Sequence, residues 1–218
     1  MQAEQRRIAE RILIAPELEA VLADTPGRIG EIATLGCRFE HAPRLPIGTS
    51  MPLRLTWEGQ PIALRTKIVW SELKLTGGDK FYHSGLQFGD EAPAELAKIR
   101  VALGKHLTRV LANLFPELPL VAKPRPVVGA VPFMATPFLS VGVEQAAPKP
   151  ASATFLEFRL RNGKWDTLET PALSQPRDGL SFPASFDPEA IEIWRSCFER
   201  SEEPVRRMLR AALEIRVG

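Results

Sequence analysis

The segment Tyr82-His83-Ser84-Gly85-Leu86-Gln87-Phe88 alternates in the way that is typical of a β-strand with two unlike faces. Its bulky side chains Tyr82, Leu86 and Phe88 fall on the same face. Thr76-Gly77-Gly78-Asp79 precedes the segment and predicts a tight turn, because glycine adopts positive φ at no steric cost. The segment is therefore predicted to be the returning strand of a hairpin.

The same period of two runs through the chain before this hairpin. Leu53, Leu55 and Trp57 alternate with polar residues, and Glu58-Gly59-Gln60-Pro61 then predicts a turn. The long strand that follows is expected to carry on one face Ile62, Leu64, Thr66, Ile68 and Trp70, with Arg65 and Lys67 on the other. Short strands joined by Gly and Pro turns are typical of an antiparallel sandwich or barrel. We expect a mainly β, α+β protein built on a small antiparallel barrel.

An amphipathic helix is expected to follow the strands, from about residue 93 to 114. Asp90 and Glu91 lie near its start, and Pro93 suits its first turn. Its apolar residues recur every three or four positions, as Leu96, Ile99, Leu103, Leu107, Val110 and Leu114. This face is expected to cover the barrel, although it would serve a dimer equally well.

Proline marks the boundaries between parts of the chain. Of the 20 prolines, eight lie between Pro116 and Pro150. Proline fixes φ and lacks a backbone donor, so this stretch is not expected to form a continuous helix or a central strand. We expect residues 1–115 to form the barrel with its helix, 116–150 to form a linker that lies on a neighbouring surface, and 151–218 to form a small α+β module.

The C-terminal module is expected to contain a hairpin and two helices. Asn162-Gly163 follows an alternating strand and is a strong hairpin signal. Asp187-Pro188 is expected to open one helix, and Ser201 is expected to cap the second. The outer face of the second helix is expected to carry Arg206, Arg207 and Arg210. That face is either solvated or a surface for an acidic partner, and so small a module is expected to dock on the barrel.

Composition and charge exclude several classes of protein. The net charge of +2 is too small to indicate bulk nucleic-acid binding, and two distant cysteines fit a reducing compartment. The charged N-terminus lacks the apolar run of a secretory signal, and the longest uncharged run, 126–143, contains prolines and is short for a membrane span. No catalytic, phosphate-loop or metal-ligand motif is present. We expect a cytoplasmic protein that is not an enzyme and holds no cofactor.

Three arginines near the N-terminus are the candidate ligand-binding residues: Arg6, Arg7 and Arg11. Arg7 and Arg11 form an RxxxR pair. A guanidinium can donate two parallel hydrogen bonds to phosphate oxygens or to the O6 and N7 edge of guanine. It can also stack on the base. The pair therefore suits a ligand that carries both phosphates and guanines, although alone it also fits a solvated basic segment.

Over about residues 5–115, the order of these motifs resembles that of a PilZ domain, the bacterial receptor module for cyclic di-GMP. That family combines RxxxR on an N-terminal segment, a [D/N]xSxxG motif at a strand end, and a barrel strand often similar to YxxGxxF. Tyr82, Gly85 and Phe88 match the last pattern. The resemblance implies a PilZ-type barrel in which the N-terminal arm wraps the ligand.

The second motif departs from the family pattern. Glu31 stands in the place of Asp or Asn, Ala33 stands in the place of Ser, and Gly36 is kept. By resemblance, the acidic group accepts from guanine N–H donors or braces the arginines. Ala33 offers no hydroxyl, and losing one neutral hydrogen bond costs about 0.5 to 1.5 kcal/mol. We therefore expect Glu31, Ala33 and Gly36 to form a weakened ligand site.

Two functions remain open at this point. The resemblance implies a cyclic di-GMP receptor that acts in second-messenger signalling through an unidentified protein partner. The alternative is a degenerate PilZ-like barrel that no longer binds nucleotide and serves as a protein-interaction scaffold. The Arg7–Arg11 pair favours the receptor, whereas Glu31 and Ala33 favour the scaffold.

Overall fold

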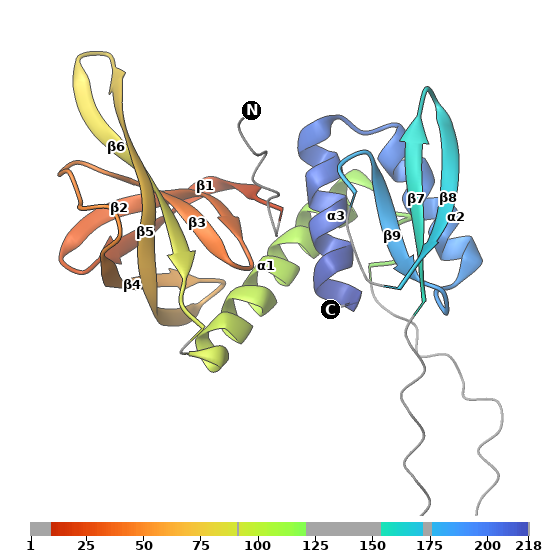
Figure 1. The fold of residues 1–218 in the computed structure, drawn as a ribbon, viewed down its shortest axis with the longest axis horizontal. Helices are drawn as coiled ribbons and strands as arrows, with labels where there is room; N and C mark the ends of the chain where they lie inside the picture. Colours follow the sequence, from red (N-terminus) through yellow and green to blue (C-terminus); the bar gives the residue numbers. More distant parts are fainter. Residues whose placement is uncertain (1–9, 91, 121–153, 172–175, 218) are drawn as a thin grey trace, which may run out of the picture.

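The computed structural model describes residues 10–90, 92–120, 154–171 and 176–217. Six antiparallel strands close into a barrel, and a separate three-stranded sheet lies with two helices in the C-terminal part (Figure 1). The barrel strands are β1 (Ile12–Leu22), β2 (Thr25–Ala33), β3 (Gly36–His41), β4 (Ser50–Trp57), β5 (Gln60–Thr76) and β6 (Asp79–Phe88). The other elements are α1 (Pro93–Leu114), β7 (Phe155–Arg161), β8 (Lys164–Thr170), β9 (Gly179–Pro183), α2 (Pro188–Glu199) and α3 (Glu203–Val217). The predicted fold class, mainly antiparallel β with helices, is confirmed.

The barrel strands are hydrogen-bonded in the order β1-β2-β3-β6-β5-β4, and β4 returns to β1. This last contact consists of three residue pairs, Ala20 with Leu55, Val21 with Arg54 and Leu22 with Leu53. Within the described residues, the first half of β1 pairs with β2 alone. The barrel is therefore closed at one end of β1 and open beside the other.

Three hairpin turns lie where glycine predicts them. Glu58 and Gly59 have φ of 49° and 74°, and Gly77 and Gly78 have φ of 62° and 96°. In the C-terminal part, the turn at 162–163 also has positive φ at both residues. Two central residues with positive φ give the twist that antiparallel strands need in a two-residue turn.

The alternating residues of β4 and β5 line the barrel core, as predicted. Leu53, Leu55 and Trp57 of β4 are at most 6% exposed. Four residues of β5 are at most 4% exposed: Ile62, Leu64, Thr66 and Ile68. The prediction for Trp70 is wrong, because a bulge between Ile68 and Trp70 shifts the register of β5 against β6.

Trp70 instead packs on the partner strand at Gly85. The two residues pair across β5 and β6, and a Cβ at Gly85 would overlap the Trp70 indole. Gly85 is therefore required by the close approach of an aromatic ring. This explains one position of the YxxGxxF pattern as a packing requirement.

The helix α1 covers the barrel with one face. Ile99, Leu103 and Leu107 are at most 1% exposed and belong to the barrel core. Leu111 continues this row and joins a second core in the C-terminal part, whereas Leu114 is 50% exposed. The prediction that Leu114 is buried is wrong, because the buried face of α1 ends at Leu111.

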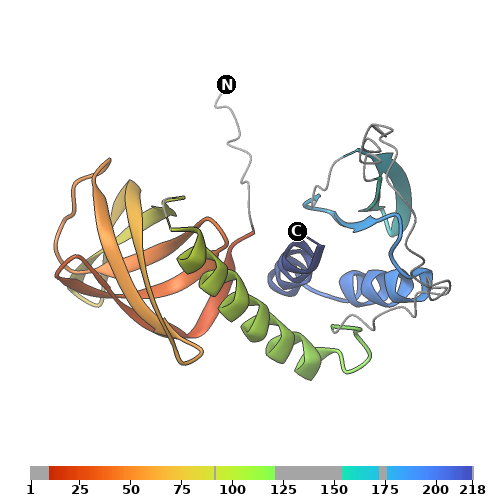
Figure 2. The ribbon, with the colours of Figure 1, turned by 90° about the horizontal axis from the view of Figure 1, so that it is seen from below.

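The C-terminal part docks on the barrel through α3, as expected from its size. Figure 2 shows α3 between the barrel and α2. Ala211 of α3 lies in the barrel core, whereas Leu209 and Leu213 lie in the second core with Trp194 and Phe182. One helix therefore serves both cores. The boundaries at 115/116 and 150/151 stay predictions, and residues 121–153 of the expected linker lie outside the described residues.

Two details of the C-terminal helices differ from the predictions. Asp187 caps α2 by accepting from the N–H of Glu189, as predicted, but the Ser201 hydroxyl donates at 2.5 Å to the Cys197 carbonyl and does not cap α3. The Ser201 hydroxyl thus satisfies a backbone carbonyl in the last turn of α2. Arg210 is 1% exposed and does not face outward, because it finds carboxylate and carbonyl partners inside the molecule.

Replacing Gly85 by alanine is expected to destabilise the barrel by about 1 to 3 kcal/mol, because the new methyl group must displace Trp70. Gly104→Ala in α1 is the matched control. A Cβ at Gly104 meets Ile215 at an ordinary 3.5 Å, so alanine should stabilise the helix by about 1 kcal/mol. Urea unfolding measures both, and equal midpoints for Gly85→Ala and the native chain would contradict this packing.

Candidate functional site

The second motif forms the hairpin between β2 and β3. Across this hairpin Ile32 pairs with Cys37, and both side chains are fully buried in the barrel core. Successive side chains of a strand point to opposite faces. Glu31, Ala33 and Gly36, which flank the buried pair, therefore lie on the outer face of the barrel.

Arg11 is brought to the same end of the barrel. It directly precedes β1, whose first residue Ile12 pairs with Ile32, so the antiparallel register sets Arg11 beside Ala33. The charge of Arg11 favours the thiolate of the nearby Cys37. Burial has the larger effect and raises the pKa of Cys37 to about 12.

The structure thus brings together four of the predicted site residues, Arg11, Glu31, Ala33 and Gly36, on one outer edge of the barrel. Arg6 and Arg7 lie outside the described residues. The first motif is therefore represented in the described structure by Arg11.

Glu31 is held by an arginine that the sequence analysis did not single out. Its carboxylate lies 3.0 Å from Nη1 of Arg38, and the two side chains are 24% and 29% exposed. The residues face each other across β2 and β3. Glu31 and Arg38 have opposite charges and lie equally far from the turn at Thr34 and Leu35. This symmetry is a sequence signal that predicts a cross-strand pair.

Gly36 has a structural role independent of any ligand. A Cβ at this position would overlap the carbonyl oxygen of Leu86 on β6. Because β3 and β6 pair at this point, a larger residue would push the strands apart. The spacing between Glu31 and Gly36 is thus explained by the hairpin alone.

Helix α3 contacts the turn of the second motif. The Glu214 carboxylate lies close to the Thr34 side chain and to the N–H of Glu10. Burial raises the pKa of Glu214, with a smaller contribution from the charge of Glu10, while the charge of Arg100 and the neighbouring Thr34 side chain and Glu10 N–H oppose the rise. Ala33, next to Thr34, is 3% exposed although it lies on the outer face.

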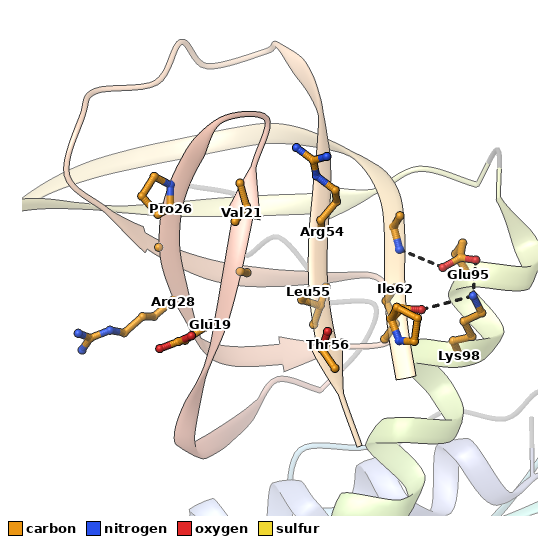
Figure 3. Close-up of a pocket in the computed structure, with 14 residues that line it drawn as sticks. Glu19, Val21, Pro26, Arg28, Arg54, Leu55, Thr56, Ile62, Glu95 and Lys98 are labelled. Atoms are coloured by element: carbon orange, nitrogen blue, oxygen red, sulfur yellow. Dashed lines mark hydrogen bonds and ion pairs between the residues drawn. The ribbon is translucent and has the colours of Figure 1, made fainter. Parts of the chain in front are cut away.

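A depression of about 1080 Å³ lies elsewhere on the barrel, over β1, β2, β4 and β5 beside the start of α1 (Figure 3). Glu95 accepts from the Ala63 N–H at 3.0 Å and holds Lys98 at 2.6 Å, which also reaches the Pro61 carbonyl at 3.4 Å. These bonds cover the part of β5 that precedes its pairing with β6. None of the four candidate residues that the structure describes lines this depression.

Among the residues that the structure describes, no group of three or more His, Cys, Asp or Glu side chains is placed to hold a metal ion. In that part of the chain, no helix is long and apolar enough to cross a membrane.

Comparisons with known proteins return two solved PilZ domains. The PilZ domain with c-di-GMP of YcgR from Escherichia coli is 14% identical, with a TM-score of 0.40 over 52% of this chain and 99% of the other. The PilZ domain of CeSA from a cellulose-synthesizing bacterium is 17% identical, with a TM-score of 0.31 over 44% of this chain and 97% of the other. No family model and no curated protein matches the chain.

The stability of the docked α3 should depend on pH through Glu214. The raised pKa of Glu214 means that the folded state favours the protonated carboxyl. The protonated carboxyl therefore contributes its full stabilisation below pH 4.5, the pKa of an ordinary Glu, and this stabilisation is lost as the pH rises through the pKa of the folded state. Glu214→Gln keeps an oxygen acceptor for Thr34 and does not titrate. The melting temperature of Glu214→Gln, relative to that of the native chain, should therefore increase from about pH 4, near the ordinary carboxyl pKa, to about pH 7.

Thermal unfolding followed by circular dichroism at several pH values measures this difference. Glu169→Gln on the exposed strand β8 is the control for loss of one carboxylate. A difference between Glu214→Gln and the native chain that stays constant with pH would contradict the assignment.

Proposed function

We propose that this chain is a non-enzymatic receptor for cyclic di-GMP. The observation that carries the proposal is the gathering of Arg11, Arg38, Glu31 and Gly36 on one outer edge of the barrel, although residue 11 is distant in sequence from the others. The motifs resemble those of PilZ domains in order and spacing. In this proposal the ligand lies on the β2–β3 hairpin and is enclosed by the segment that carries Arg7.

The chemistry of the side chains fits the two kinds of group in the ligand. Arg11 would take a phosphate or the Hoogsteen edge of a guanine, and Arg7 would take another. Arg38 adds a guanidinium, and its ion pair at 3.0 Å fixes the Glu31 carboxylate on the same surface. A carboxylate so placed is an acceptor for guanine N–H donors.

The output of such a receptor is proposed to be a protein contact in the bacterial cytoplasm. A receptor without its own catalytic chemistry transmits a signal by changing which surfaces it presents. The docked C-terminal part supplies a surface that is linked directly to the candidate site, through the contact of Glu214 with Thr34.

A scaffold that does not bind nucleotide is the second candidate. The burial of Ala33 favours it, because a residue that is 3% exposed offers little surface to a ligand. The existing pair between Glu31 and Arg38 favours it as well, since a ligand would compete for both groups. Under this function, the barrel would bind its protein partner irrespective of nucleotide.

Isothermal titration calorimetry of the full chain with cyclic di-GMP tests the receptor. We expect saturable binding that Arg7→Ala/Arg11→Ala weakens by at least about a hundredfold, because two charge-assisted contacts are worth about 1.5 to 3 kcal/mol each. Arg28→Ala/Arg54→Ala removes the same charge from residues that line the other depression and should retain binding.

Equal weakening by both double variants would indicate a general charge effect in place of a defined site. Absence of heat with the native chain, with binding of a protein partner unchanged by nucleotide, would favour the scaffold.

A further inference from the structure

Arg210 is a fully desolvated guanidinium in the middle of α3. Its Nε donates to Glu10 at 2.8 Å, its Nη2 donates to Glu203 at 3.0 Å, and its Nη1 donates to the Arg177 carbonyl at 2.5 Å. The Arg210 side chain is 1% exposed, whereas Glu10 is 23% exposed. Because a buried charge requires partners, this cluster fixes α3 to the residue that directly precedes Arg11.

Glu214 forms a second contact one helical turn further along α3. Its carboxylate lies close to the N–H of Glu10, to the side chain of Thr34 and to Arg100 of α1, which all favour its charged form. Glu10 lies on the arm of the first motif, and Thr34 lies within the second motif. A single helix from the far end of the chain therefore holds both halves of the candidate nucleotide site.

The docked helix covers part of the surface that the ligand would need. Ala33 is on the outer face, yet it is 3% exposed, and its neighbour Thr34 lies close to Glu214 of α3. The carboxylates of Glu10 and Glu214 also lie at this edge. A ligand with two phosphates brought to Arg11 would add negative charge beside them, which both Coulomb repulsion and lost contacts oppose.

We propose that α3 is an intramolecular competitor of the nucleotide: cyclic di-GMP and docked α3 bind the same edge of the barrel, so binding of one releases the other. This inference rests on the proposed function. Because only the undocked fraction binds the nucleotide, a change that weakens the docking of α3 tightens nucleotide binding by up to the same factor. The released helix, with Arg210 freed from Glu10, is then the surface that changes on signalling.

The coupling is tested on the full chain with Glu214→Ala and with Arg210→Met/Glu214→Ala. Both variants leave Arg7, Arg11 and the β2–β3 hairpin unchanged. Calorimetry with cyclic di-GMP should give a dissociation constant at least about fivefold lower than that of the native chain, the lower end of usual coupling factors. Glu169→Ala on exposed β8 removes the same charge far from α3 in sequence and should leave the affinity unchanged.

Amide hydrogen exchange supplies a second readout that does not depend on the variants. Cyclic di-GMP added to the native chain should accelerate exchange in α3, and Glu214→Ala should show faster exchange there before any ligand is added. This measurement keeps the test decisive if the double variant fails to fold.

The outcomes separate this inference from the function on which it rests. Binding to the Glu214→Ala chain alone, or tighter binding to it, supports competition. Binding with equal affinity to all chains, and with no change in α3 exchange, overturns the competition while leaving the receptor intact. Absence of binding to every chain overturns both.

Discussion

Closure of the barrel between β1 and β4 is the constraint on which the rest of the structure depends. Three residue pairs make this closure, so the first half of β1 is left with β2 as its partner among the described residues. The apolar interior must be covered at that opening, and α1 supplies Ile99, Leu103 and Leu107 for the purpose. α3 then packs beside α1 and contributes Ala211 to the same core. The position of α3 near Arg11 is thus a consequence of how the barrel is covered.

Much of the barrel could be predicted from local sequence. Turns with glycine at positive φ and strands with a period of two depend on adjacent residues, so they are visible without a structure. Trp70 was misplaced because a bulge changes the alternation without a clear local signal. Strand β9 was not anticipated because its five residues are nearly all buried, so they show no alternation. The burial of Arg210 depends on Glu10, which is 200 positions away.

The candidate site shows the same division between local and distant information. The outward placement of Glu31 and Gly36 follows from the hairpin register, and the pairing of Glu31 with Arg38 could have been read from their symmetry about the turn. The burial of Ala33 could not, because the alternation of β2 places this residue on the outer face. Gly36 and Gly85 are both explained by packing against a neighbouring strand, so their presence indicates the fold and does not by itself indicate a ligand. The functional proposal therefore depends on Arg11, Glu31 and Arg38.

The most direct test is an NMR titration of the isotope-labelled full chain with cyclic di-GMP, because it locates binding residue by residue. The account predicts saturable shifts in the amides around Arg11 and across the β2–β3 hairpin from Glu31 to Arg38, together with shifts along α3. Shifts confined to the depression around Arg54 and Lys98, or no saturable shifts at all, would contradict it.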